Sequence, residues 1–124
     1  MDMSGSTRVL VVEDDESIRD FVHMALADAG YEVVEASDGV VALALLGTAR
    51  PDVILLDMLM PLMDGWEFAR LYHERPGPHV PIIVVTAARD VAARAGQINA
   101  AGFLAKPFRL DALFACVAAV TRSR

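Results

Sequence analysis

The sequence holds a single cysteine, Cys116, so no intramolecular disulfide bond can form, and a reducing compartment is the simplest setting for the protein. No apolar stretch approaches the roughly 18 residues that are needed to cross a bilayer. Residues 1–7 lack the basic start and the apolar run of a signal peptide. We therefore expect a cytoplasmic protein without membrane contact, in which residues 1–7 form a flexible lead-in.

Basic residues and histidines are also scarce. Lys and Arg together number 11 against 17 Asp and Glu, which gives a net charge of −6. This net negative charge argues against a domain that binds nucleic acid by neutralising its phosphates. It does not exclude a local cation site, which needs only a few carboxylates. The histidines at positions 23, 73 and 79 are too dispersed to predict a metal site. Direct binding of nucleic acid is therefore not expected.

What the sequence has in quantity is apolar residues. They make up 55% of the 124 residues, and the mean hydropathy is +0.41, which excludes a disordered chain and indicates a core shielded on more than one side. The length is enough for one domain with one core and not for two. We assign residues 8–122 to this domain.

The apolar residues fall into five short runs, most of which are continuous rather than alternating, as is typical of parallel strands covered on both faces. These runs are residues 9–12, 32–36, 53–56, 82–85 and 103–105. Segments of helical period follow each of them, at residues 18–29, 38–49, 65–73, 90–101 and 110–122. Five βα units in succession predict an α/β fold with one doubly wound parallel sheet.

Polar residues follow four of the five predicted strands. In such a sheet, ligands bind outside the carboxyl ends of the strands. The second run, which ends on Ala36 and Ser37, adds nothing obvious. The other four runs end, in chain order, on Glu13-Asp14, on Asp57, on Thr86 and on Lys106-Pro107. We expect these side chains to gather at one rim of the sheet.

The residue types at this rim suit the chemistry of phosphoryl transfer. Three carboxylates, from Glu13, Asp14 and Asp57, repel one another unless a cation or a proton intervenes. Oxygen ligands without a set of His or Cys favour Mg²⁺ or a similar hard ion. A carboxylate beside such an ion can act as a nucleophile towards phosphorus. Lys106 would offset the charge of the phosphoryl oxygens, and Thr86 would donate a hydrogen bond to one of them.

Taken singly, each of these residues has a plainer explanation. An acidic residue after a strand is commonly a helix cap or a turn former, and we expect Asp15 to be a cap. Thr86 alone would be a cap, and Lys106 alone a solvated cation. Their placement on the ends of successive strands is what favours a shared site.

These residues resemble the receiver domain of two-component response regulators over nearly the whole chain, from Arg8 to about Val120. The matching segments are RVLVVEDDESIRDFV, DVILLDMLMPLMDGWEF, PIIVVTA and GFLAKPF. The resemblance implies a flavodoxin-like topology with strand order 2-1-3-4-5. It also implies Mg²⁺-dependent transfer of a phosphoryl group from a sensor histidine kinase or a histidine phosphotransfer protein.

The resemblance assigns roles to individual residues. Asp57 matches the phosphoacceptor, and Lys106 matches the lysine that binds the phosphoryl group. Glu13, which stands where many members have Asp, and Asp14 match the acid pair that holds Mg²⁺. Leu59 matches the position whose backbone carbonyl also binds the metal. Thr86 matches the switch hydroxyl, Phe103 the switch aromatic and Pro107 a proline that usually follows a cis peptide bond. Plain core packing is the alternative for Phe103.

In the family, phosphorylation repacks a surface that corresponds here to residues 90–101, 103–105 and 110–122. A downstream protein target or a fused output domain is the implied partner. The last of these helices is rich in alanine and short of charge, which favours contact with another helix. That helix could belong to a target or to a second copy of the chain.

Two other functions share parts of this pattern. A Mg²⁺-dependent phosphatase that uses Asp57 as a turnover nucleophile generally needs a second acid two residues later, and that residue is Leu59. A flavin-binding module of the same topology needs a phosphate loop rich in Ser, Thr and Gly, whereas EDDES is anionic. Leu59, and Ala88 two residues after Thr86, cannot orient a water molecule, so we also expect slow self-dephosphorylation. We do not expect a turnover enzyme.

Overall fold

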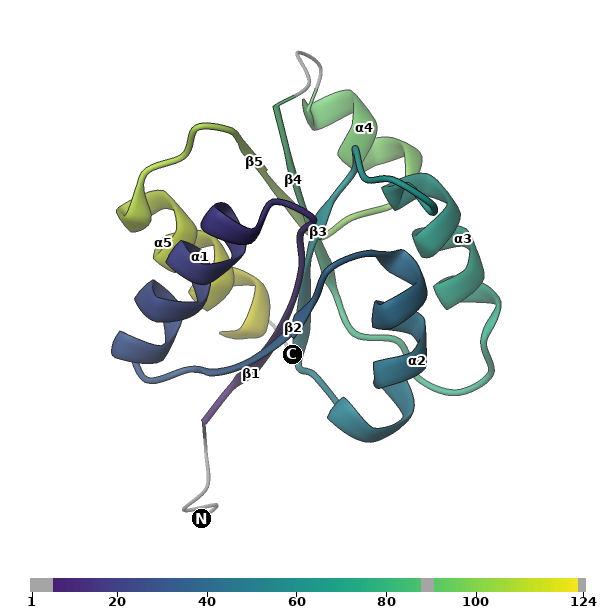
Figure 1. Cartoon of the computed structure of the whole chain (residues 1–124), viewed down its shortest axis with the longest axis horizontal. Helices are drawn as coiled ribbons and strands as arrows, with labels where there is room; N and C mark the ends of the chain where they lie inside the picture. The colour runs from purple at the N-terminus through teal and green to yellow at the C-terminus, as the bar shows by residue number, and fades with distance from the viewer. Residues whose placement is uncertain (1–5, 88–90, 123–124) are drawn as a thin grey trace.

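Five parallel strands, each followed by a helix, form one sheet between two layers of helices in the computed structural model, which describes residues 6–87 and 91–122 (Figure 1). The strands are β1 (Arg8–Val12), β2 (Glu32–Ala36), β3 (Val53–Asp57), β4 (Ile82–Thr86) and β5 (Gly102–Ala105). The helices are α1 (Glu16–Asp28), α2 (Gly39–Ala49), α3 (Gly65–Glu74), α4 (Val91–Gln97) and α5 (Leu110–Arg122). The strand order is β2-β1-β3-β4-β5, which confirms the flavodoxin-like topology.

The helices divide between the two faces of the sheet, with α1 and α5 on one face and α2, α3 and α4 on the other (Figure 1). All residues of β3 and β4 are buried because both faces are covered. Alternate strand residues fill two cores: Leu10 belongs to the core that includes Phe68 of α3, and Val9 to the core that includes Leu113 of α5. Within the described residues, no helix is long and apolar enough to cross a membrane.

Aspartates fix where the first three helices begin. Asp15, Asp38 and Asp64 each accept a hydrogen bond, at 2.9 Å, from the backbone N–H three residues later. This is the usual N-cap arrangement, and it confirms the cap expected at Asp15. Because β1, β2 and β3 precede these caps closely, the chain turns into each helix at the carboxyl rim of the sheet.

Helix α4 is shorter than the sequence predicts, since its apolar period runs over residues 90–101 but the helix ends at Gln97. Asn99 takes a left-handed conformation with φ of 57°, and the N–H of Ala100 bonds back to the carbonyl of Ala95 at 2.8 Å. This closes the helix earlier than its apolar period suggests. Asp90, Ala88 and residues 1–5 of the expected lead-in lie outside the described residues.

Gly65 allows the turn from β3 into α3 to pass close to the strand end. Its N–H donates to the carbonyl of Met58 at 2.9 Å. A Cβ atom at this position would lie 2.7 Å from the Cα of Met58 and would also overlap the sulfur of that side chain. The glycine is therefore required by close backbone approach, directly beside the end of β3.

We predict that Gly65→Ala lowers the free energy of unfolding by about 1–3 kcal/mol, because the backbone of Met58 has no room to move aside. Gly47→Ala is the matched control, since Gly47 lies inside α2 and an added methyl group there would have nothing within 4 Å. The control should gain about 0.5–1 kcal/mol from the better helix propensity of alanine. Urea unfolding of both variants gives the comparison, and a neutral Gly65→Ala would contradict the close approach.

Candidate functional site

The carboxyl ends of β1 and β3 bring three carboxylates together. The two strands are neighbours, with Val12 paired to Leu56, so the residues that end them lie side by side. One oxygen each of Glu13, Asp14 and Asp57 lies within 4.8 Å of the others. Glu13 and Asp57 are each only 4% exposed, whereas Asp14 is exposed. The sequence prediction of an acidic cluster at this rim is therefore met by the geometry.

Lys106 reaches the same cluster from the end of β5. Its Nζ lies 2.7 Å from Oε1 of Glu13 and 3.4 Å from Oδ2 of Asp57. The N–H of Lys106 donates to the carbonyl of Thr86 at 2.9 Å, which ties this loop to the end of β4. The peptide bond between Lys106 and Pro107 is cis, in agreement with the expectation. One ammonium group is thus shared by two buried carboxylates.

Burial and the charges in this cluster together shift the pKa of Asp57 and of Lys106. Burial, together with the charge of Glu13, raises the pKa of Asp57 to about 6, against the opposing effects of Lys106 and of the Leu59 amide. That amide donates to Oδ1 of Asp57 at 3.2 Å. Burial alone would lower the pKa of Lys106, but hydrogen bonds and charge from Glu13 and Asp57 together raise it above its ordinary value. Lys106 is therefore a cation, and the carboxylates are held under mutual repulsion.

The two residues expected to act as a switch lie on neighbouring strands. Thr86, the last residue of β4, is fully buried next to the cluster, paired in register with Ala105 of β5. Phe103 in β5 is 48% exposed, so core packing is the wrong interpretation of this residue. Leu59 also leaves its side chain largely exposed. The aromatic ring therefore faces outward in this structure.

An apolar hollow of about 300 Å³ adjoins Lys106. It lies between the start of α1 and the loop that leads into α5. Its lining is formed by Ile18, Phe21, Ala87, Lys106, Pro107 and Phe108. Phe21 and, one turn further along α1, Met24 are exposed. The site therefore opens beside a surface that can receive an apolar partner.

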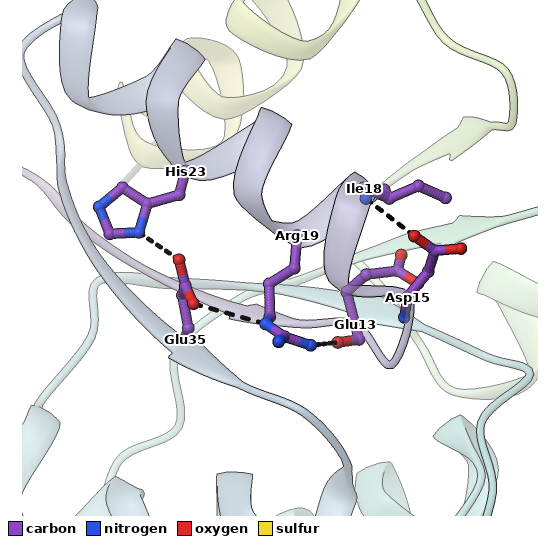
Figure 2. Close-up of polar contacts among 6 residues, drawn as sticks. All are labelled: Glu13, Asp15, Ile18, Arg19, His23 and Glu35. Carbon is purple, nitrogen blue, oxygen red and sulfur yellow. Dashed lines mark hydrogen bonds and ion pairs between the residues drawn. The ribbon is translucent and has the colours of Figure 1, made fainter.

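Sequence reasoning missed two residues next to this rim, Arg19 in α1, which contacts Glu13, and Glu35 in β2, which contacts Arg19. Arg19 donates from Nη1 to the backbone carbonyl of Glu13 at 2.8 Å, and its Nε lies 3.4 Å from Oε1 of Glu35 (Figure 2). The only sequence signal was an acidic residue within the apolar run 32–36. That signal does not indicate which residue Glu35 contacts, because its partner Arg19 lies 16 residues earlier, in a helix.

The donor set at the rim fits a hard divalent cation. Its three side chains offer oxygen atoms only, at separations that one ion can bridge. Two of the three carboxylates are buried with one lysine between them, so the cluster carries excess negative charge in a poorly solvated position. Such a set can hold a cation such as Mg²⁺ and leave one carboxylate oxygen to react.

The raised pKa of Asp57 predicts a pH-dependent stability for the metal-free protein. The pKa of Asp57 is about 6 in the folded protein and 3.8 in an unfolded chain, so the folded protein holds this proton more tightly. The resulting contribution to the free energy of unfolding is full below pH 3.8 and is lost as the pH rises through 6. The difference in free energy of unfolding between Asp57→Asn and the wild type should therefore increase in favour of the variant by about 2 kcal/mol from pH 4.5 to pH 7.5. Urea unfolding with a chelator at both pH values measures this, and a constant difference would contradict it.

Comparison with known proteins agrees with this geometry. The family model for the response regulator receiver domain matches residues 9–118. Response regulator MprA of Mycobacterium bovis is 40% identical over 119 residues, an alignment that covers 94% of this chain and 51% of MprA. MprA of Mycobacterium ulcerans shows the same identity and coverage. The chain therefore spans about half the length of the curated relatives that it matches.

Solved structures share the fold over more than nine-tenths of the chain. The receiver domain of Francisella response regulator 1452 superposes with a TM-score of 0.87 at 28% identity, covering 95% of this chain and 98% of that one. Chemotaxis response regulator CheY4 of Vibrio cholerae gives a TM-score of 0.85 at 37% identity, with coverage of 93% and 98%. In sequence and in fold alike, the chain belongs to the response regulator receiver domains of two-component signalling.

Proposed function

We propose that the chain is a phosphoacceptor that takes a phosphoryl group onto Asp57 from a phosphohistidine of a sensor histidine kinase or a histidine phosphotransfer protein. The observation that carries the proposal is the placement of Asp57, buried at the end of β3 with Lys106 at 3.4 Å and two further acids beside it. The single free cysteine, Cys116, suits a reducing cytoplasm, where we place the protein.

Glu13, Asp14 and Asp57, with the backbone carbonyl of Leu59, are the proposed ligands of Mg²⁺. The three side chains supply oxygen donors within 4.8 Å of one another, which supports this assignment. When bound, Mg²⁺ offsets the negative charge of the carboxylates and of the phosphoryl oxygens.

The chain's own residues account for the transfer step. A carboxylate oxygen of Asp57 forms a bond to phosphorus while the bond from phosphorus to the donor's imidazole nitrogen breaks, and the bonding electron pair stays on that nitrogen. Lys106 then exchanges part of its contact with the carboxylates for contact with the phosphoryl oxygens. Thr86 donates its hydroxyl hydrogen bond to one of these oxygens.

Docking of the donor is supported by the apolar hollow beside Lys106. The hollow and the exposed side chains of Phe21 and Met24 on α1 flank the open side of the site. A helical donor protein could bury these side chains while presenting its phosphohistidine to Asp57. The excess acidic charge of the chain gives no reason to expect direct contact with nucleic acid.

The output of the switch is proposed to run from Thr86 to the α4-β5-α5 surface. As Thr86 moves towards the phosphoryl group it vacates space, and Phe103, which faces outward in this structure, turns inward to fill it. The changed surface would bind a downstream protein, a fused output domain or a second copy of the chain. A fused domain is consistent with relatives about twice as long as this chain.

No observation favours the Mg²⁺-dependent phosphatase. Leu59 stands where such an enzyme needs its second acid, and its side chain is apolar and exposed. We therefore propose that the chain only transfers a phosphoryl group to itself and slowly loses it, without turnover of an external substrate.

The acceptor assignment predicts that wild-type protein gains one phosphoryl mass from acetyl phosphate with Mg²⁺, or one beryllofluoride adduct, and that Asp57→Asn gains neither. Asp64→Asn is the matched control, because it lies in the same loop and asparagine also caps a helix. The control should be modified like the wild type. Intact-protein mass spectrometry measures all three, and a phosphorylated Asp57→Asn protein would falsify the assignment.

Leu59 predicts a long-lived phosphoryl group, because its side chain cannot orient a water molecule for hydrolysis. Release should take minutes or longer in the wild type, and Leu59→Asn should accelerate it by about tenfold by placing an amide beside Asp57. Leu62→Asn serves as the control, since Leu62 is exposed in the same loop and its φ of 68° suits asparagine. Phosphate release from labelled protein tests this; unchanged or slower release in Leu59→Asn would contradict it.

A further inference from the structure

The loop between β1 and α1 carries two of the three acids, and Glu13 is its anchor. The N–H of Glu13 donates to the carbonyl of Ala36 at 3.1 Å, and Oε2 of Glu13 accepts from the N–H of Asp15 at 3.1 Å. Its other carboxylate oxygen contacts Lys106. The backbone carbonyl of Glu13 is the remaining polar group of this residue, and Arg19 binds it.

Arg19 is held in place by the acid that pairs with it. Its side chain is only 15% exposed, and one guanidinium group contacts both the carbonyl of Glu13 and the carboxylate of Glu35. The other oxygen of that carboxylate contacts Nδ1 of His23, one turn further along α1. Figure 2 shows the resulting chain of contacts, which runs from His23 through Glu35 and Arg19 to the loop that bears Glu13.

A hydrogen bond that fixes the carbonyl of Glu13 also fixes the backbone N–H of Asp14. The carbonyl of Glu13 and the N–H of Asp14 belong to one planar peptide unit, so a hydrogen bond to the carbonyl restricts the orientation of both residues. Within the part of the chain that the structure describes, the exposed carboxylate of Asp14 has no hydrogen bond of its own. Its direction therefore depends on the backbone, and the planar fork of an arginine restrains a carbonyl more tightly than a lysine would.

We propose that Arg19, held by Glu35, is a positioning residue for the cation site, because it fixes the peptide unit that joins Glu13 to Asp14. The inference rests on the proposed metal site and extends it to two residues outside the three acids. Arg19 acts through the backbone and does not touch the ion.

The sign of the effect separates positioning from simple electrostatics. Arg19 is a cation close to a cation site, so on charge alone its removal should strengthen Mg²⁺ binding. Positioning predicts the opposite, because the acids lose their preset geometry. Loss of a residue that orients metal ligands typically weakens affinity by about 10–100-fold. We expect Arg19→Gln to raise the Mg²⁺ dissociation constant by about tenfold.

Arg8 provides a matched control at the far end of β1. It pairs with Glu32 of β2 through Nε at 3.0 Å and donates to the carbonyl of Ala49 at 2.6 Å, which repeats the chemistry of Arg19 away from the site. Arg8→Gln removes the same charge and similar contacts. It should leave the Mg²⁺ dissociation constant within about twofold of the wild type, since it leaves the loop at Glu13 untouched.

The experiment is calorimetric titration of the full chain with MgCl₂, for wild type, Arg19→Gln, Arg19→Lys and Arg8→Gln. Arg19→Lys retains the charge and loses the fork, so it should weaken binding by less than Arg19→Gln. Amide NMR shifts of the metal-free proteins give a second readout. The signals of Asp14 and Asp15 should move in Arg19→Gln and stay in place in Arg8→Gln.

A double mutant tests the role of Glu35. If Glu35 acts only by holding Arg19, adding Glu35→Gln to Arg19→Gln should change Mg²⁺ affinity much less than Glu35→Gln does in the wild type. Equal or tighter binding by Arg19→Gln, or equal weakening by Arg8→Gln, would overturn the inference. A wild type that fails to bind Mg²⁺ would overturn the proposed function itself.

Discussion

The contact of Lys106 with two buried carboxylates is the interaction on which the rest of the site depends. Without its ammonium group, Glu13 and Asp57 would be two like charges in a poorly solvated position, which costs free energy unless one of them takes up a proton. The contact also joins β1, β3 and the loop after β5, so one charge cluster holds three segments of the rim. A ligand that changes the charge at Asp57 must therefore change the forces on all three.

The path from this cluster to the surface follows from the order of the strands. Asp57 ends β3, Thr86 ends the neighbouring β4, and Lys106 follows β5 at the sheet edge, bonded through its backbone to Thr86. Strand pairing thus places Phe103, in the edge strand, within two strands of Asp57. Asp57 thus ends a strand in the middle of the sheet, whereas Phe103 lies in an edge strand with its side chain partly exposed.

The order of the elements and the acidic rim could be predicted because burial on both faces leaves apolar runs that are mostly continuous, and the polar residues after four of the five runs mark the rim. The ends of elements were less predictable, since α4 stops on the left-handed turn at Asn99. The outward position of Phe103 depends on the packing at an edge strand. Arg19 and Glu35 were missed because their meeting is a tertiary contact between a helix and a strand, which periodicity does not specify.

The two acids of β2 that bind Arg8 and Arg19 have a consequence for the open edge of the sheet. β2 is the outermost strand beyond β1, and an outermost strand presents unpaired backbone groups to other molecules. Glu32 and Glu35 place charge along this strand, near both of its ends, and each is tied to an arginine. Charged side chains along an edge strand disfavour the addition of a strand from a neighbouring molecule, so the same residues that order the molecule internally oppose its aggregation.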